Sequence, residues 1–247
     1  MTRIAVISDI HGNCVALDTA LADIDRASVD QIVCLGDAIQ GGAQPAATVR
    51  RLRELACPVV MGNADAWMLT GVETGGEPTT ETMERVRQWS LAQLSADDQA
   101  SIAAFAPTVT IPLTAERALL CFHGTPTSFD EILLPSTPSE DFRRVLDPYA
   151  PAILTGGHPH LQPIRQLTET FFFNPGSVGL VGNYELPEER YRREPWVEYA
   201  ILSATDGVDG VISLEFRRLP LPMEALREAL ATSGHPDAER VLHEYGL

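Results

Sequence analysis

The chain has 247 residues, which is ample for a buried core, and we expect one domain over residues 1–247. Its hydrophobic content of 45% and charged content of 21% are those of a folded globular protein, and they exclude a chain that is disordered throughout. The 34 acidic residues outnumber the 18 basic residues, all of them arginine, and the net charge of −16 disfavours binding to a nucleic acid polymer.

Signals for export or for membrane insertion are not found. The apolar stretch IAVIS is followed at once by Asp9, which is not the pattern of a signal peptide. The longest uncharged stretch, residues 99–115, contains Pro107 and Pro112 and is a poor membrane span. We therefore expect a cytoplasmic protein that does not bind a membrane. The four cysteines have no zinc-site spacing, and we expect them to be reduced thiols in the core.

The first third of the chain alternates short apolar stretches with helical patterns, which is typical of a layered α/β protein. RIAVIS (3–8), QIVCLG (31–36) and PVVMG (58–62) read as strands. Helices are expected over 13–26, with Asn13 as its N-cap, and over 45–56, with a proline in its first turn.

Residues 65–106 interrupt this alternation. Two helices are expected there, over 81–90 and 95–105, after a loop that contains Gly75 and Gly76. We interpret this segment as a helical cap inserted into the α/β domain.

The second half of the chain is rich in strands, and we expect its sheet to be mainly antiparallel. Two strands, 109–113 and 118–122, flank a turn at 114–117, and a helix over 139–146 leads to a strand at 152–155. Four more strands are expected at 163–167, 170–174, 197–203 and 211–216, with turns at Asp206-Gly207 and Asp209-Gly210. Two helices, from about Met223 and Asp237, occupy residues 222–247, and His235 and His243 are expected to be solvated at their ends.

Ligand-type side chains follow five of the apolar stretches. IAVIS ends in Asp9 with His11 two residues on, IVCLG ends in Asp37, VVMG in Asn63, LLCF in His123, and AILTGG in His158 and His160. Sites in α/β sheets are built in the crevice at the carboxyl ends of strands, so we expect these side chains to meet there.

The donor types in this set suit metal ions. Carboxylates, an amide oxygen and imidazoles bind Mn, Fe, Zn and similar ions, and the set lacks thiolates. Seven ligands are too many for one ion but suffice for two ions that share a carboxylate. Two-metal sites with ions about 3.5–4 Å apart hydrolyse phosphate esters, because a bridging water loses a proton near neutral pH and attacks phosphorus in line.

The order and spacing of these residues carry a family resemblance. The series Asp9-x-His11, Gly36-Asp37, Gly62-Asn63, His123-Gly124 and Gly157-His158-Pro159-His160 resembles the calcineurin-like metallophosphoesterase superfamily, from residue 4 to about residue 180. SDIHGN, QWSLAQLS, CFHGTP and FFFNPGSVGL are similar to its small prokaryotic phosphodiesterase-like branch.

The resemblance implies a fold and a ligand set. The fold is a four-layer α/β/β/α sandwich, in which two mixed β-sheets are flanked by helices. One metal is held by Asp9, His11 and His160, the second by Asn63, His123 and His158, and both by Asp37. The catalytic residues that it implies are Asp37, Asn63 and His123, together with the metal-bridging hydroxide.

Two departures from the family pattern bear on activity. Many members have a histidine acid after the asparagine ligand, whereas this chain has Ala64. The neighbouring Asp65 could compensate, or could cap a helix that begins near Ala66. The sequence GDAIQGG also lacks the Asp-Arg pair of the protein phosphatase branch.

Substrate contacts are the least specific prediction. The segment NPGSVG, with Gly176 and Ser177, could offer backbone N–H groups to a phosphate or could be a tight turn. Asn13 could contact substrate as well as cap its helix, and Asp65 is a further candidate for a substrate contact.

The leading hypothesis is a dinuclear-metal phosphoesterase that hydrolyses a small phosphodiester or phosphomonoester. Mn is the expected metal, and the same ligands tolerate Fe, Zn, Ni or Co. The alternative is a catalytically weak metal-binding scaffold or regulatory protein, as in the retromer scaffold subunit. All seven ligand positions are filled, which favours the enzyme.

Overall fold

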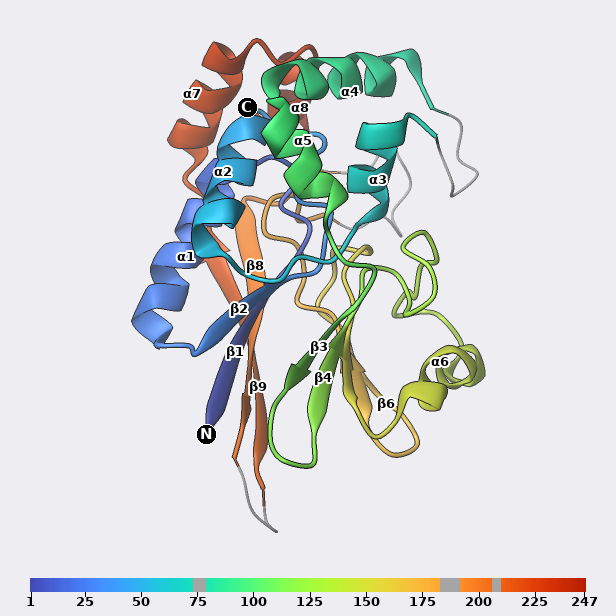
Figure 1. Ribbon diagram of the computed structural model, residues 1–247. Coiled ribbons are helices and arrows are strands. Elements are labelled where there is room, and N and C mark those ends of the chain that lie inside the picture. Colours follow the sequence, from blue (N-terminus) through green and yellow to red (C-terminus); the bar gives the residue numbers. More distant parts are fainter. Residues whose placement is uncertain (73–78, 183–191, 206–209) are drawn as a thin grey trace.

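Two β-sheets lie face to face in the computed structural model, which describes residues 1–72, 79–182, 192–205 and 210–247 (Figure 1). The first sheet has the order β2-β1-β8-β9, formed by Gln31–Cys34, Thr2–Ile7, Trp196–Ala204 and Ile212–Pro220. The second has the order β3-β4-β5-β7-β6, formed by Val109–Pro112, Ala118–Cys121, Ile153–Thr155, Phe171–Phe173 and Ile164–Gln166.

Both sheets are mixed. In the first, β1 pairs with β2 in parallel and with β8 antiparallel. In the second, β5 pairs in parallel with β4 and with β7. The expectation of a mainly antiparallel second half is therefore wrong at the centre of this sheet, because helix α6 (Ser139–Leu146) makes a crossover between β4 and β5.

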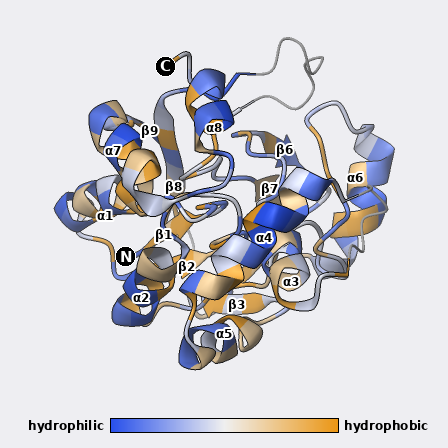
Figure 2. Ribbon diagram, turned by 90° about the horizontal axis from the view of Figure 1, so that it is seen from above, coloured by the Kyte–Doolittle hydropathy of each residue, from blue (hydrophilic) through white to orange (hydrophobic). Residues whose placement is uncertain are grey.

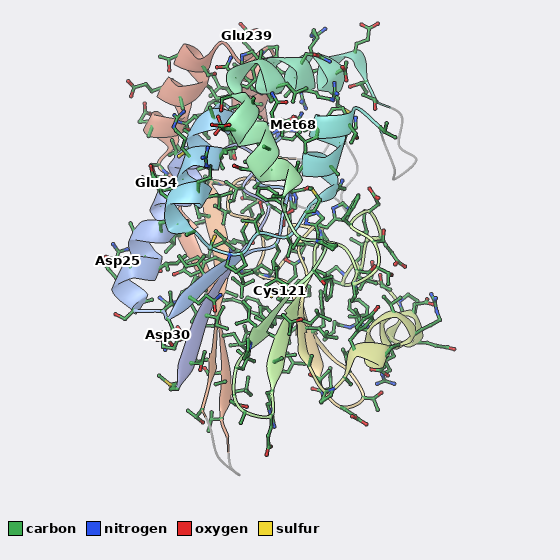
Figure 3. The ribbon with its side chains drawn as sticks, in the orientation of Figure 1. Asp25, Asp30, Glu54, Met68, Cys121 and Glu239 are labelled. Carbon is green, nitrogen blue, oxygen red and sulfur yellow. The ribbon has the colours of Figure 1, made fainter. Side chains whose placement is uncertain are left out.

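The alternation of side chains along β1 creates two core layers. Ile4 and Val6 pack between the sheets, and Ala5 and Ile7 pack under the helices. Cys121 of β4 lies in the layer between the sheets, whereas the charged Asp25, Asp30 and Glu54 lie at the outer surface (Figure 3). Surface placement of such carboxylates is how a chain of this net charge avoids burying unpaired charge.

Helices cover the outer faces of both sheets, so the four-layer arrangement follows. The first sheet is covered by α1 (Cys14–Ala27), α2 (Pro45–Leu55), α7 (Met223–Ser233) and α8 (Ala238–Glu244). On the second sheet, Phe142 and Leu146 of α6 pack with Phe122 and Phe172. The side chain of Asn13 accepts a hydrogen bond from the Ala16 N–H, so the predicted N-cap of α1 is confirmed.

The segment interpreted as a cap contains α3 (Asn63–Thr70), α4 (Glu81–Gln93) and α5 (Ala96–Ala103), which lie above the strand ends (Figure 1). Seen from above, α4 crosses the molecule between α8 and α3 (Figure 2). Met68, Leu94 and Ile102 from this segment join the core under the helices. The expected loop at Gly75 and Gly76 and the turns at 206–209 lie outside the described residues.

One expected strand is not formed. In PVVMG, Val59 makes a single bridge to Cys34 and Val60 a single bridge to Ala106. Pro58 lacks an N–H group, and the chain turns into α3 at Gly62, so a ladder does not extend. Across the described residues, no helix has the length and apolar character that crossing a membrane requires.

Candidate metal centre

The side chains predicted to form a site converge above the carboxyl ends of parallel strands. Asp9 follows β1, Asp37 follows β2, His123 follows β4, and His158 and His160 follow β5. Backbone hydrogen bonds join these loops in pairs. The Asp9 N–H donates to the Gly36 carbonyl at 3.0 Å, and the Gly157 N–H donates to the His123 carbonyl at 2.8 Å.

One group of donors consists of Asp9, His11 and His160, each of which offers one ligand atom within 4.8 Å of the others. His160 Nε2 lies 3.2 Å from Asp9 Oδ1 and 3.1 Å from His11 Nε2. Asp9 and His160 are buried, whereas His11 is half-buried.

A second group consists of Asp37, His123 and His158, whose ligand atoms also lie within 4.8 Å of one another. Asn63, the first residue of α3, places its Oδ1 atom 3.0 Å from His123 Nε2 and so joins this group. Asn63 and His158 are half-buried, which leaves this side of the site accessible.

Asp37 lies between the two groups. Its Oδ2 atom is 3.4 Å from His123 Nε2 and 3.9 Å from His11 Nε2. Its Oδ1 atom accepts a hydrogen bond of 2.8 Å from the Ala64 N–H, in the first turn of α3. One carboxylate oxygen therefore faces both groups while the other is held by the helix.

The tautomers of two imidazoles follow from their backbone partners. His11 Nδ1 lies 2.9 Å from the Gln40 carbonyl oxygen, and His123 Nδ1 lies 2.8 Å from the Leu35 carbonyl oxygen. A carbonyl only accepts, so both Nδ1 atoms carry hydrogen, and the Nε2 atoms, which face Asp37 and Asn63, are the ones able to bind a metal. Lone pairs and carboxylates that face one another need a cation between them. The residues present therefore fit metal ions.

The pKa shifts of these groups show that the buried carboxylates favour positive charge beside them. Burial by itself would raise the pKa of Asp37, but the His123 and His11 imidazoles outweigh it and hold that pKa below its usual range. Burial lowers the pKa of His123, but Asp37 outweighs it and raises this pKa to about 9, so a proton occupies Nε2 when no metal does. Burial, followed by the charge on His123, lowers the pKa of His158 to about 4.

The backbone is left-handed at most of the donor residues. Among the described residues, seven non-glycine residues have a positive φ in this region, and five of them belong to the donor set: Asp9, His11, Asp37, His158 and His160. The other two, Ser28 and Ala56, are helix C-caps, where this conformation is usual. Side chains disfavour this region, and residues held there concentrate at functional sites.

Two glycines allow the loops to approach each other. A Cβ atom at Gly62 would overlap the carboxylate and the N–H group of Asp37, and one at Gly157 would overlap Ser8 Oγ. The glycines before Asn63 and His158 are thus required by close contact between backbone and donor residues.

The expected substrate contacts lie behind the site. In NPGSVG, the Val178 and Gly179 N–H groups donate to the Ser8 and Asp9 carbonyls at 2.9 and 3.0 Å. Ser177 is buried, and its Oγ donates to the Asp9 carbonyl at 2.7 Å, while the Gly176 N–H donates to Asn174 Oδ1. Asn13 is also buried, with its Oδ1 used as the N-cap. The Val178 and Gly179 N–H groups thus support the loop of Asp9, and the Gly176 N–H closes its own turn, as the tight-turn alternative expects.

Asp65 does not cap a helix at Ala66. Helix α3 begins at Asn63 with Gly62 as its N-cap, and Asp65 lies inside the first turn with its side chain fully buried. Its carboxylate accepts hydrogen bonds of 3.0–3.1 Å from the Ala38 and Ile39 N–H groups. Burial, and then the Asp37 carboxylate, raise the pKa of Asp65 to about 7.

His235 is a further correction. It was expected to be solvated, but only 6% of it is exposed, and its Nε2 atom lies 3.1 Å from the Gly41 carbonyl oxygen. His243 is exposed, as expected. No local pattern in the sequence signals the contact of His235, because its partner lies 194 residues away.

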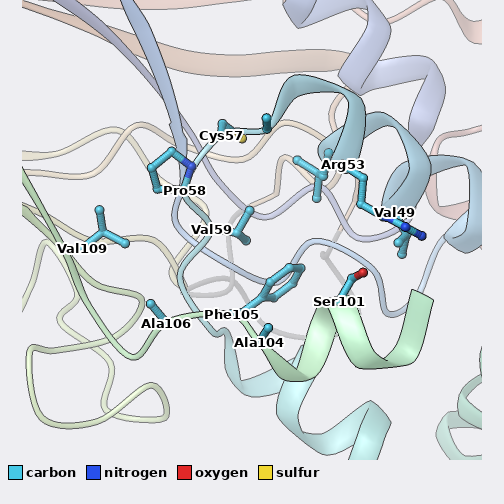
Figure 4. A pocket seen from close by; sticks show the side chains of 12 residues that line it. Val49, Arg53, Cys57, Pro58, Val59, Ser101, Ala104, Phe105, Ala106 and Val109 are labelled. Carbon is cyan, nitrogen blue, oxygen red and sulfur yellow. The ribbon is translucent and has the colours of Figure 1, made fainter. Parts of the chain in front are cut away.

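A hollow between α2 and α5 lies apart from these donors (Figure 4). Its lining includes the apolar side chains of Val49, Leu52, Val59 and Phe105, and it contains none of the donor residues. The converging donors are therefore the stronger candidate for a chemical site.

Comparisons with known proteins identify the fold and the family of the chain. Solved structures similar to this chain include a metallophosphoesterase from Sphaerobacter thermophilus, 20% identical with a TM-score of 0.71 over 98% of this chain and 99% of that chain. They also include the hypothetical protein PH1004 from Pyrococcus horikoshii OT3, 16% identical with a TM-score of 0.80 over 99% and 98% of the two chains. At these identities the likeness shows the fold, and the predicted four-layer arrangement of two mixed sheets is confirmed.

Sequence comparison adds the family. The uncharacterized protein MJ0912 from Methanocaldococcus jannaschii is 47% identical over 68 residues, a segment that spans 28% of this chain and 28% of that relative. The signature of the calcineurin-like phosphoesterase superfamily domain matches residues 2–203, which is most of the chain and contains every member of the donor set. By its sequence and by its fold, this protein belongs to the calcineurin-like phosphoesterase superfamily.

Proposed function

We propose that the protein is a dinuclear-metal phosphoesterase that hydrolyses a small phosphodiester or phosphomonoester. The observation that carries the proposal is that one oxygen of Asp37 faces two groups of donors. In this proposal the first metal is held by Asp9, His11 and His160, the second by Asn63, His123 and His158, and both by Asp37.

The roles of the protein groups follow from their contacts. When bound, two metal ions would act as Lewis acids that lower the pKa of a coordinated water to near neutrality. They would also offset the negative charge of a phosphate ester. The Ala64 N–H fixes the Asp37 carboxylate, and the Gln40 and Leu35 carbonyls fix the rings of His11 and His123. The half-buried side of the site, at Asn63 and His158, is where a phosphate group can approach.

Substrate preference follows from the missing acid. Ala64 offers a methyl group beside Asn63, and Asp65 is buried against backbone N–H groups, so neither donates a proton to a departing oxygen. Hydrolysis then depends on a good leaving group, which favours activated diesters over alkyl monoesters. The net charge of −16 favours small substrates over nucleic acid polymers. Mn is the expected metal, with Fe, Zn, Ni and Co as alternatives for these oxygen and nitrogen donors.

The test is the rate of bis-p-nitrophenyl phosphate hydrolysis with added Mn, beside a chelator-treated sample and the Asp37→Asn variant. We expect hydrolysis that requires metal and falls by about 100-fold or more in the variant, because the two metal ions would lose the carboxylate ligand that they share. Circular dichroism checks that the variant is folded. Asp25→Asn is the matched control, because Asp25 is an exposed carboxylate on α1, and it should keep the wild-type rate.

A different result would favour the scaffold alternative. If the folded wild-type chain binds two metal ions and yet hydrolyses activated diesters and monoesters only at the background rate, the enzyme proposal is wrong. The metal ions would then have a structural or regulatory role.

A further inference from the structure

His235 lies in the connection between α7 and α8, and both of its ring nitrogens have partners. The Asp237 N–H donates to Nδ1 at 3.1 Å, so the hydrogen of the neutral ring is on Nε2, which donates to the Gly41 carbonyl at 3.1 Å. The ring also packs edge-on against Trp89 of α4, with centroids 5.0 Å apart. Its position and tautomer are therefore fixed from three sides.

Gly41 belongs to the loop that holds His11. The carbonyl of the preceding residue, Gln40, accepts the hydrogen bond from His11 Nδ1 at 2.9 Å. A Cβ atom at Gly41 would lie 3.8 Å from the same Nδ1 atom, so this loop passes directly beside the imidazole. Gly41 has a φ of 113°, a conformation that glycine adopts easily and that by itself does little to fix the loop.

The two donor groups differ in how their imidazoles are supported. The carbonyl that fixes His123 belongs to Leu35, which directly follows β2 and is held by the hydrogen bond from its N–H to the Ile7 carbonyl at 2.9 Å. The carbonyl that fixes His11 belongs to a loop outside any strand. A contact at Gly41 therefore acts most directly on the support of His11, whereas the carbonyl that fixes His123 is held by the sheet.

The supporting residue comes from outside the family region. The family signature ends at residue 203, and α7, His235 and α8 follow it. The segment also contacts the NPGSVG turn, where Tyr245 Oη lies 3.5 Å from the Gly179 carbonyl oxygen.

We propose that His235 is a positioning residue for the first metal, which holds the Gln40 carbonyl against His11 through the hydrogen bond to Gly41. The inference rests on the proposed function, because it assigns His11 to a metal. Substitution of a residue that orients a metal-binding histidine typically lowers metal affinity by about 10–100-fold. His235 does not contact His11 itself but acts through Gly41 and Gln40, so we expect its loss to weaken metal affinity by about tenfold.

Calorimetric titration of Mn²⁺ into metal-free protein tests the proposal. The wild-type chain should bind two ions. His235→Ala should weaken one binding event by about tenfold and leave the other within about twofold, because only one group loses its support. His235→Gln keeps an N–H donor at the position of Nε2 and should restore most of the affinity. His243→Ala is the matched control, since His243 is an exposed histidine of α8, and it should behave as wild type.

Two backgrounds show which group responds. In a His158→Ala chain, where the first group is intact, His235→Ala should still weaken Mn²⁺ binding. In a His11→Ala chain, where the first group is broken, it should have no further effect. The thermal midpoint of each variant is measured without metal, and the Gln variant decides the question if the Ala variant does not fold.

The outcomes separate the two proposals. If the wild-type chain binds no metal, the proposed function fails, and this inference fails with it. If the wild-type chain binds two ions but His235→Ala weakens both equally, or if Gln fails to restore affinity, the proposed function stands and His235 is a structural residue only.

Discussion

Ala64 is the residue that most limits the proposed chemistry. Its N–H group holds Asp37, but its side chain carries no proton to donate, at a position where many members of the superfamily have a histidine. The half-buried methyl group lies next to Asn63 on the accessible side of the site. A longer side chain there can extend towards solvent without displacing the core.

Ala64→His should therefore extend the substrate range. A well-placed general acid contributes about 10²–10⁴-fold, and we expect an increase of at least about tenfold for an alkyl phosphate ester, with little change for p-nitrophenyl esters. Steady-state rates on both substrates measure this. Ala66→His on the same helix is the control. Equal rates of wild type and Ala64→His on the alkyl ester would contradict the prediction.

The sequence identifies some site residues and misses others for a physical reason. Asp9, Asp37 and His123 lie two or three residues after the ends of strands, so the position of a strand end indicates where they lie. Asp65 and His235 are placed by contacts with distant loops, at Ala38 and Gly41 respectively. Such contacts depend on how layers dock, and local patterns do not encode them.

At the scale of single elements, most helix starts agree with the sequence prediction, and the start of α3 does not. Helix α5 begins as expected after Ser95, which forms a capping box with Asp98. The expected start of α6 at Ser139 is also confirmed. Helix α3 has Gly62 as its N-cap and no capping side chain, and its start was misplaced. PVVMG does not form a strand because it has only single bridges to its neighbours. Whether an apolar stretch becomes a strand depends on its pairing partners, which the stretch itself does not encode.

The capping box predicts how the stability of α5 depends on pH. The Ser95 side chain donates to Asp98 and lowers the pKa of that carboxyl below its usual value. A pKa lowered in the folded state gives stability that is present above the unfolded value, about 3.9, and that is lost as the pH falls through the folded value. Asp98→Asn should therefore destabilise the protein at pH 7 by about 1 kcal/mol and by less at pH 3.

Thermal unfolding of metal-free protein at both pH values measures this difference. Asp97→Asn is the control, because Asp97 is an exposed carboxylate in the same turn of α5. A destabilisation by Asp98→Asn that is the same at pH 7 and pH 3 would show that the charge of Asp98 does not contribute.

For the whole molecule, metal binding should stabilise the fold, because the donors come from segments that meet only when the sheets face each other. At a metal concentration of 100 times the dissociation constant, binding to the folded state adds about 2.7 kcal/mol, which raises the thermal midpoint by roughly 5–10 °C for a chain of this size. Differential scanning calorimetry with Mn and with a chelator measures it. The shift should shrink in Asp37→Asn, and an unchanged midpoint in wild type would contradict metal binding.

The left-handed backbone at five donor residues also has a consequence for how this sequence can change. Each such residue costs of order 1–3 kcal/mol, and a glycine at any of these positions would relax the backbone. Selection for thermal stability alone would therefore remove these aspartates and histidines first. Substitutions at these positions that raise stability would therefore also remove donor atoms of the proposed metal centre.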